Sequence, residues 1–189
     1  MREQIFGIDF DGTICNTSAL KQKYVSENLG VSIEPWQANR TVLIRELKLM
    51  NETGYDRMID AICNVEGTLS AKPMPKAKES LARLSGKGSI FVVTGRDDTY
   101  LLAAVKWMKR EGLDCYVKGY ISSKSRNKPK AEICREMNIT HMIDDDPGHF
   151  EEMSDGVVGI LIRHGYDGGQ TDDVVKHASS WDEAVKYLI

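Results

Sequence analysis

The sequence of 189 residues lacks paired cysteines, and its histidines have no metal-ligand spacing. Its four cysteines, Cys15, Cys63, Cys115 and Cys134, are far apart and form no C-x-x-C pair. This spacing argues against a zinc ribbon or a dithiol redox motif. Because each cysteine lies among apolar residues, we expect reduced and mostly buried thiols, as in a cytoplasmic protein.

Long apolar runs and a strong excess of one charge are also missing. No run approaches the roughly 20 apolar residues that cross a bilayer, and the apolar stretch before Asp9 is too short for a signal-peptide core. The formal net charge of −3 gives no global basic field that would favour nucleic acid or a membrane surface. The hydrophobic fraction of 41% and the charged fraction of 28% are those of an ordinary globular protein.

Short β-branched runs alternate with helical patterns along most of the chain. We expect strands at residues 5–8, 89–93, 141–143 and 156–163, with a weaker one near Ile121. Helical patterns cover residues 75–85, 97–111 and 129–137, and a capping box at 180–183 opens a last short helix. The glycine-rich residues 165–169 are expected to form an exposed loop. This alternation predicts an α/β fold with a doubly wound, Rossmann-like and mostly parallel sheet.

Residues 16–72 break the alternation, because they show helical patterns and no convincing strand. We expect one helix over residues 20–29, a second over 43–50 that ends near Gly54, and a third over 58–62. A connection of this length is far above the normal range. The sequence therefore predicts a helical cap at residues 16–72, inserted after the first strand of a core domain formed by residues 1–15 and 73–189.

Polar clusters follow three of the predicted strands, at residues 9–13 (DFDGT), 94–96 (TGR) and 144–147 (DDDP). Right-handed crossovers bring the carboxyl ends of parallel strands to one edge of the sheet, where ligands bind. Asp9 and Asp11 project to the same side of an extended segment, and Asp144 and Asp145 add two more carboxylates. Such a cluster repels itself unless a proton or a cation intervenes, and the hard cation Mg²⁺ suits oxygen ligands.

A calcium loop of the EF-hand type is a weaker interpretation of residues 9–13. It needs glycine at its sixth position and glutamate at its twelfth, where this chain has Ile14 and Leu20. The preceding segment is also a predicted strand, whereas an EF-hand loop follows a helix.

In their order along the chain, these clusters resemble motifs I, II and IV of the haloacid dehalogenase-like (HAD) superfamily of phosphohydrolases. A lysine within residues 124–130 resembles motif III, and the helical insertion stands where that family carries its first cap. The resemblance extends from residue 5 to about residue 163. Within the superfamily the chain is most similar to the deoxyribonucleotidase-like group, in which a lysine-led helix precedes I-D-D-x-P. Asp146 departs from that pattern, because arginine or serine is more usual there.

The resemblance implies a Mg²⁺-dependent phosphomonoesterase that forms an aspartyl-phosphate. Asp9 would attack phosphorus, and Asp11 would serve first as general acid and then as general base. Dehalogenases of the superfamily lack the second aspartate, so Asp11 favours phosphate-ester chemistry. Mg²⁺ would lie among Asp9, the backbone carbonyl of Asp11 and Asp144, with Asp145 binding a metal-bound water or orienting the lysine.

The resemblance also implies a set of residues that bind the phosphoryl group. Thr94 would offer its hydroxyl and Gly95 its backbone N–H to a phosphoryl oxygen. Arg96 would reach the phosphate or pair with a neighbouring acidic side chain. Lys128, directly before a predicted helix, is the predicted phosphate-binding lysine, with Lys124 and Lys130 as alternatives.

The substrate class stays open between several hypotheses. The resemblance favours a small phosphorylated substrate, nucleotide-like or another phosphate ester, as for a 5′-nucleotidase. A polynucleotide 3′-phosphatase shares three of the motifs, and the basic loop at residues 124–130 would suit nucleic acid, whereas the overall acidity favours a small molecule. The non-enzymatic alternatives are a phospho-accepting receiver-like module, in which the acidic pair would come first along the chain, and a silent binding module.

Overall fold

Residues 4–153, 156–165 and 175–189 are described by a computed structural model. They contain one sheet of six parallel strands in the order β3-β2-β1-β4-β5-β6. The strands are β1 (Gln4–Ile8), β2 (Gly88–Thr94), β3 (Gly119–Ser122), β4 (His141–Asp144), β5 (Val158–Ile162) and β6 (Val175–Ala178). The chain runs outward from β1 first to one side and then to the other, so the order reverses between β1 and β4. The predicted doubly wound α/β fold is confirmed.

Every strand expected from the sequence is present, and the weak signal near Ile121 is β3. The sequence did not indicate β6, a short edge strand that pairs only with β5. Its residues, Val-Lys-His-Ala, carry little of the apolar signal of a central strand, because an edge strand is only partly buried. The glycine-rich segment at 165–169 lies, beyond Gly165, outside the described residues.

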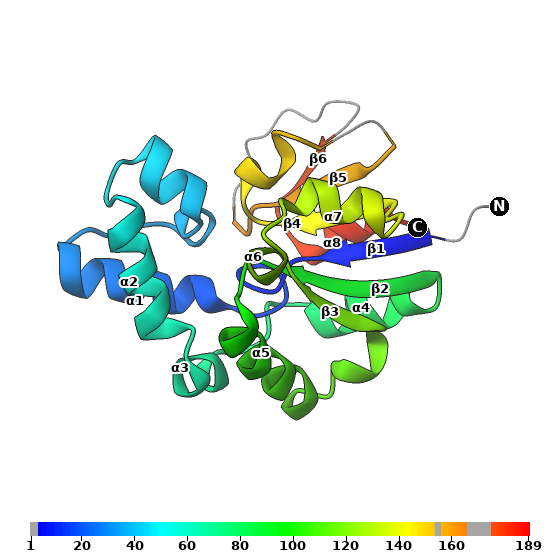
Figure 1. The fold of residues 1–189 in the computed structure, drawn as a ribbon, viewed down its shortest axis with the longest axis horizontal. Coiled ribbons are helices and arrows are strands. Elements are labelled where there is room, and N and C mark those ends of the chain that lie inside the picture. Colours follow the sequence, from blue (N-terminus) through cyan, green and yellow to red (C-terminus); the bar gives the residue numbers. More distant parts are fainter. Residues whose placement is uncertain (1–3, 154–155, 166–174) are drawn as a thin grey trace.

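Helices cover both faces of the sheet (Figure 1). On one face lie α4 (Ala77–Ser85), α5 (Asp98–Arg110) and α8 (Trp181–Lys186), whose buried side chains include Leu81, Trp107 and Trp181. On the other face α7 (Lys130–Glu136) packs through Ile133 and Cys134. Two shorter helical turns, α6 (Ser123–Arg126) and η3 (Asp114–Tyr116), join β3 to its neighbours. Each large side chain fully buried in these layers contributes about 1.5–3 kcal/mol to folding.

The segment predicted as a cap is helical and lies beyond the carboxyl ends of the strands (Figure 1). It consists of α1 (Thr17–Leu29), η1 (Pro35–Gln37), η2 (Val42–Glu46), α2 (Glu52–Ile62) and α3 (Val65–Ser70). Val25, Leu43 and Met58 form part of a hydrophobic cluster of its own. At its base, the backbone N–H of Asn16 donates to the carbonyl of Lys72 over 2.8 Å. The division into a cap at 16–72 and a core domain stays a prediction that these features support.

The second helix predicted in the cap, at residues 43–50, is wrong. The chain there forms one π-helical turn, η2, and Gly54 lies inside α2 instead of ending a helix. The side chain of Asn51 accepts a hydrogen bond of 2.9 Å from the backbone N–H of Gly54. This N-cap starts α2 at Glu52, so the helix begins before the predicted residue 58.

Among the described helices, none is long and apolar enough to cross a membrane.

Candidate active site

The carboxyl edge of the sheet brings the predicted polar clusters together. Asp9 follows β1 directly, Thr94 ends β2 and Asp144 ends β4. The backbone N–H of Asp9 donates to the carbonyl of Ile143 over 2.8 Å, which fixes the two strand ends next to each other. The edge is therefore built by neighbouring strands at the point where the strand order reverses.

Gly12 allows the chain to turn back sharply over this edge. Its φ of +82° suits glycine, and a Cβ built there would lie 2.2 Å from Oδ2 of Asp145. Any side chain at this position would therefore push Asp145 away. The glycine of the DFDGT motif is thus required both by the backbone and by the acidic residue that packs against it.

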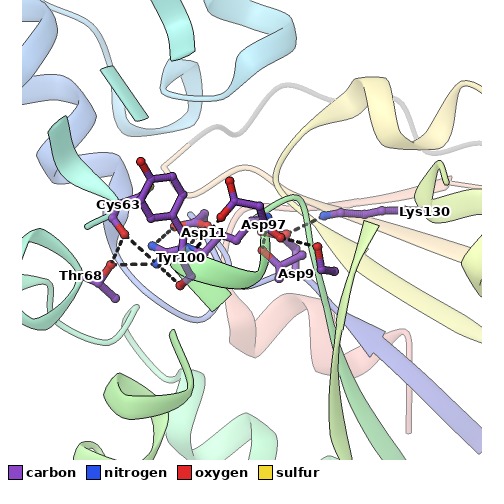
Figure 2. A network of polar contacts seen from close by, with 10 residues as sticks. Asp9, Asp11, Cys63, Thr68, Asp97, Tyr100 and Lys130 are labelled. Atoms are coloured by element: carbon purple, nitrogen blue, oxygen red, sulfur yellow. Dashed lines mark hydrogen bonds and ion pairs between the residues drawn. The ribbon is translucent and has the colours of Figure 1, made fainter. Parts of the chain in front are cut away.

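Three carboxylates converge at the site. Asp9, Asp144 and Asp145 each offer an oxygen, and these oxygens lie within 4.8 Å of one another. All three residues are buried, with 4%, 0% and 9% of their surface exposed. The ammonium of Lys130 lies 2.5 Å from Oδ1 of Asp9 and 2.7 Å from Oδ2 of Asp144, and Figure 2 shows it reaching the cluster from one side.

The pKa shifts in this cluster reflect the burial of its carboxylates, which nearby cations oppose. Burial raises the pKa of Asp9 to about 6, although the Lys130 ammonium opposes that rise. Burial also raises the pKa of Asp145 well above its ordinary value. For Asp144 burial acts in the same direction, but His149 and Lys130 outweigh it and lower the pKa. Counted as ionised groups, Asp9, Asp144 and Asp145 carry three negative charges against the one positive charge of Lys130.

Oxygen donors, burial and unbalanced negative charge are the features of a site for a hard divalent cation. The three carboxylates fit Mg²⁺ in their chemistry and in their spacing, because their oxygens are close enough to share one ion. Of the residues predicted at the metal site, Asp9, Asp11, Asp144 and Asp145, the carboxylates of Asp9, Asp144 and Asp145 are thus brought together. The carboxylate of Asp11 is not part of this group.

Asp11 instead forms a bidentate ion pair with Arg96. Nε and Nη2 of Arg96 donate to the two carboxylate oxygens of Asp11, each over 2.8 Å. Burial alone would raise the pKa of Asp11, but the charge and hydrogen bonds of Arg96 lower it below the ordinary value. Asp11 is therefore held in its ionised form. The expected pairing of Arg96 with Asp97 and Asp98 is wrong, because its carboxylate partner is Asp11. Its contact with a phosphate stays a prediction.

Arg96 also connects the core to the cap. Its Nη1 donates to two residues of the cap, to the hydroxyl of Thr68 over 2.8 Å and to the carbonyl of Cys63 over 3.4 Å. The same atom donates to the carbonyl of Tyr100, on α5 of the core, over 3.2 Å. Figure 2 shows Asp11 beside Thr68, Cys63 and Tyr100, while Asp9 lies next to Lys130. One buried guanidinium therefore holds Asp11 and the last part of the cap at the same time.

Thr94 and Gly95 occupy the end of β2, as the TGR motif predicts. The Thr94 hydroxyl accepts a hydrogen bond of 3.2 Å from the backbone N–H of Arg96. A Cβ built on Gly95 would meet nothing within 4 Å, so open space lies in front of this residue. Gly95 lines the cavity at the site, whereas Thr94 is buried beside it in the chain.

Lys128 does not reach the site, and this part of the prediction needs correction. It lies on the surface, where it pairs with Glu132 over 2.7 Å and with Glu136. Pro129 is the N-cap of α7 rather than its first helical residue, so Lys130 takes the first position and points into the protein. Lys130 has 2% of its surface exposed, whereas Lys124 is exposed and pairs with Asp97 over 3.4 Å.

Sequence reasoning missed two residues near the acidic cluster. Nδ1 of His149 lies 2.9 Å from Oδ2 of Asp144. Asp146 accepts hydrogen bonds from the backbone N–H groups of Gly148, over 2.9 Å, and Thr41 of the cap, over 3.2 Å. No pattern of spacing indicates His149, which comes from η4 (Pro147–Phe150). The D-P-G string at 146–148 was a usable signal for Asp146 as a cap of that turn.

A cavity of about 390 Å³ lies between the cap and the acidic cluster. Lys21 and Tyr55 line it from the cap, and Asp9, Asp145 and Arg96 line it from the core. Its size is at the small end of the range for small-molecule sites, which is roughly 300–1,000 Å³. The cavity therefore opens Asp9 and Asp11, two of the predicted catalytic residues, to a small ligand.

Comparison with known proteins shows the fold. No family model and no curated protein matches this sequence. Among solved structures, a haloacid dehalogenase-like hydrolase from Streptococcus pneumoniae is 18% identical with a TM-score of 0.62, over 99% of both chains. The HAD-hydrolase YfnB from Bacillus subtilis, bound to magnesium, is 12% identical with a TM-score of 0.62, over 100% of this chain and 99% of its own.

A third similar structure is the L-2-haloacid dehalogenase from Xanthobacter autotrophicus with chloropropionic acid covalently bound. It is 12% identical, with a TM-score of 0.57 over 99% of this chain and 98% of its own. The chain therefore has the haloacid dehalogenase-like fold, including a helical cap region. Similarity to the deoxyribonucleotidase-like group stays a prediction.

Proposed function

We propose that the protein is a Mg²⁺-dependent phosphomonoesterase that uses Asp9 as its nucleophile. The observation that carries this proposal is the buried group of Asp9, Asp144 and Asp145 at the carboxyl edge of the sheet, with Asp11 two residues beyond Asp9. The magnesium named in the YfnB structure, which has the same fold, supports the choice of metal.

In the proposed reaction, a carboxylate oxygen of Asp9 attacks phosphorus and the bond to the leaving oxygen breaks. The result is an aspartyl-phosphate and an alcohol, and water then cleaves the intermediate to inorganic phosphate. Lys130 supports this role because its ammonium, 2.5 Å from Asp9, favours the ionised nucleophile. Thr94 and Gly95 would receive the phosphoryl oxygens in the open space at the end of β2.

Asp11 supplies the proton transfers of both half-reactions. It protonates the leaving oxygen first and then takes a proton from the attacking water. The ion pair with Arg96 keeps Asp11 ionised, which is the form that the second half-reaction needs. The first half-reaction requires a protonated Asp11, so entry of the leaving group has to loosen this ion pair.

Asp9, Asp144 and Asp145 would hold the magnesium ion, together with the backbone carbonyl of Asp11. When bound, the ion supplies a positive charge that offsets the negative charge of the phosphoryl group. Lys130 and His149 keep the carboxylate of Asp144 ionised and oriented for this role.

A small substrate, nucleotide-like or another phosphate ester, fits better than a polynucleotide. Residues of the cap line one side of the cavity, and the cations of the basic loop are already paired with acidic side chains. Lys124 pairs with Asp97, Lys128 pairs with Glu132 and Arg126 lies 4.0 Å from Glu136. This loop therefore offers little free positive charge to a phosphate backbone.

We also propose a cytoplasmic location, because all four cysteines are free thiols and three of them are buried.

The test is phosphate release from an aryl phosphate by the purified protein with and without Mg²⁺. We expect Mg²⁺-dependent release that is lost in Asp9→Asn and strongly reduced in Asp11→Asn. Full activity of Asp9→Asn, after removal of contaminating phosphatase, would overturn the proposal. Halide release from chloropropionate, without phosphate release from any ester, would instead indicate a dehalogenase.

A further inference from the structure

Lys21 is a buried cation that faces the cavity from the cap. It lies on α1, has 3% of its surface exposed and lines the cavity opposite the acidic cluster. Its ammonium lies 5.9 Å from the centre of the Tyr55 ring. Among the described residues, its ammonium has no hydrogen-bond partner and no carboxylate within 4.0 Å, and it is not one of the fully buried side-chain atoms that lack a partner. The ammonium therefore faces the open space of the cavity.

The other cations around the cavity are all paired. Arg96 binds Asp11, Arg40 binds Glu52 and Lys124 lies near Asp97. Lys130, deeper in the site, is shared by Asp9 and Asp144. Of the lysine and arginine side chains in the described part of the site, Lys21 is therefore the one left without an ion-pair partner.

The environment of Lys21 keeps its positive charge. Burial lowers the pKa of Lys21, but Tyr55 and the charges of Asp145 and Asp11 raise it well above its ordinary value. A charged side chain that faces a cavity without an ion-pair partner is available to a ligand of opposite charge.

The position of Lys21 indicates which part of a substrate it would meet. The phosphoryl group would bind on the core side, at Thr94, Gly95 and the metal site. Lys21 lines the same cavity from the cap, together with Tyr55. A cation on the cap side therefore faces the portion of the substrate that extends away from the phosphoryl group, which is the leaving portion.

We propose that Lys21 binds a second anionic group, a carboxylate or a second phosphate, on the leaving portion of the substrate. This inference rests on the proposed phosphatase function and narrows its substrate class to compact phosphate esters that carry two anionic groups. Charge-assisted hydrogen bonds of this kind contribute about 1.5–3 kcal/mol, which corresponds to roughly tenfold to hundredfold in binding.

The test compares three esters of ethylene glycol size in the presence of Mg²⁺: hydroxyethyl phosphate, phosphoglycolate and ethylene glycol bisphosphate. We expect the wild-type protein to prefer phosphoglycolate, ethylene glycol bisphosphate or both over hydroxyethyl phosphate. The expected preference is at least about tenfold in kcat/KM. Which of the two is preferred distinguishes a carboxylate from a second phosphate. Lys21→Met should remove most of this preference, mainly through KM, and Lys21→Arg should keep part of it. A wild-type enzyme without the preference, or a Lys21→Met variant that retains it, would overturn the inference.

Two controls separate this inference from folding defects and from the phosphatase proposal. Lys23→Met changes an exposed lysine of the same helix, with 72% of its side chain exposed, and should keep the wild-type preference. Calorimetry on the inactive Asp9→Asn protein measures binding of the same esters without turnover. If Lys21→Met weakens the binding of the tighter-binding ester with two anionic groups, the result supports the anion site even when no ester is hydrolysed. Equal binding before and after the substitution contradicts it. Absence of hydrolysis by the wild type counts against the phosphatase proposal alone.

Discussion

The ammonium of Lys130 lies 2.5 Å from Oδ1 of Asp9, and the same group lies 2.7 Å from Oδ2 of Asp144. Lys130 is the first residue of α7, whereas Asp9 follows β1 and Asp144 ends β4. One lysine therefore ties a helix on one face of the sheet to the two central strand ends. Burial lowers the pKa of this lysine, but Asp144 and Asp9 outweigh that effect and raise it.

Removal of the Lys130 ammonium should abolish activity and destabilise the protein. Lys130→Met leaves two buried carboxylates without their cation, and breaking a buried ion pair in this way costs about 3–5 kcal/mol. We expect phosphatase activity to fall at least about a hundredfold and the urea midpoint to decrease. Lys128→Met, which changes a surface lysine, is the matched control. A larger loss in Lys128→Met than in Lys130→Met would restore the assignment made from the sequence.

Substitution of Gly12 should disturb the position of Asp145. In Gly12→Ala the new Cβ would lie 2.2 Å from Oδ2 of Asp145, at a φ of +82° that alanine adopts poorly. Gly30→Ala is a matched control for the backbone alone, because Gly30 has a φ of +68° and nothing within 4 Å of its Cβ position. The control should cost about 1–2 kcal/mol in the free energy of unfolding. Gly12→Ala should cost more and should weaken Mg²⁺ binding, and equal effects of the two substitutions would show that the contact with Asp145 is unimportant.

Mg²⁺ should stabilise the folded protein through the three carboxylates. At a concentration one hundred times the Kd, the ion adds about 2.7 kcal/mol, which raises the Tm by roughly 5–10 °C for a chain of this size. Beryllium fluoride, a phosphoryl mimic, should raise the Tm further when Mg²⁺ is present. Asp144→Asn should reduce both shifts, whereas Asp56→Asn, an exposed residue at the cavity rim, should not. Thermal melts that Mg²⁺ leaves unchanged in the wild type would argue against the metal site.

The pH dependence of activity should reveal the control of Asp11 by Arg96. Arg96 lowers the pKa of Asp11 against the effect of burial, so Arg96→Met should raise that pKa. The limb of the pH–kcat/KM profile on which Asp11 loses its proton should then move to higher pH. Arg45→Met, which removes an exposed arginine paired with Glu151, should leave this limb in place. An unshifted limb in Arg96→Met would mean that the ion pair does not govern the titration of Asp11.

The same ion pair predicts a change in the pH dependence of stability. Because the pKa of Asp11 is lowered in the folded state, the stabilisation is present above the ordinary aspartate pKa and is lost as the pH falls through the lowered value. Unfolding measured at a series of acidic pH values should therefore show a smaller loss of stability in Arg96→Met than in the wild type. Parallel curves for the two proteins would contradict this expectation.

The fold and most of the acidic site were accessible from the sequence, because strand periodicity and the positions of Asp9 and Asp144 after buried strands are local signals. The identity of the lysine at the acidic site was not accessible from the sequence. The choice between Lys128 and Lys130 depends on whether Pro129 is the N-cap or the first residue of α7. A shift of one position turns the side chain from solvent into the core. Long-range partners such as Arg96 with Asp11 or Thr68, and Asp146 with Thr41, leave no periodic trace. Such contacts form only when separate segments of the chain meet in three dimensions.

The most direct test of the central claim is chemical trapping of the phosphorylated nucleophile. The protein is mixed with Mg²⁺ and an aryl phosphate, quenched in acid during turnover and treated with borohydride, which reduces an aspartyl-phosphate to homoserine. Mass spectrometry of the peptide that contains Asp9 should then show homoserine at position 9, only when both substrate and Mg²⁺ were present. Homoserine at another aspartate, or none at all during measurable turnover, would contradict the account.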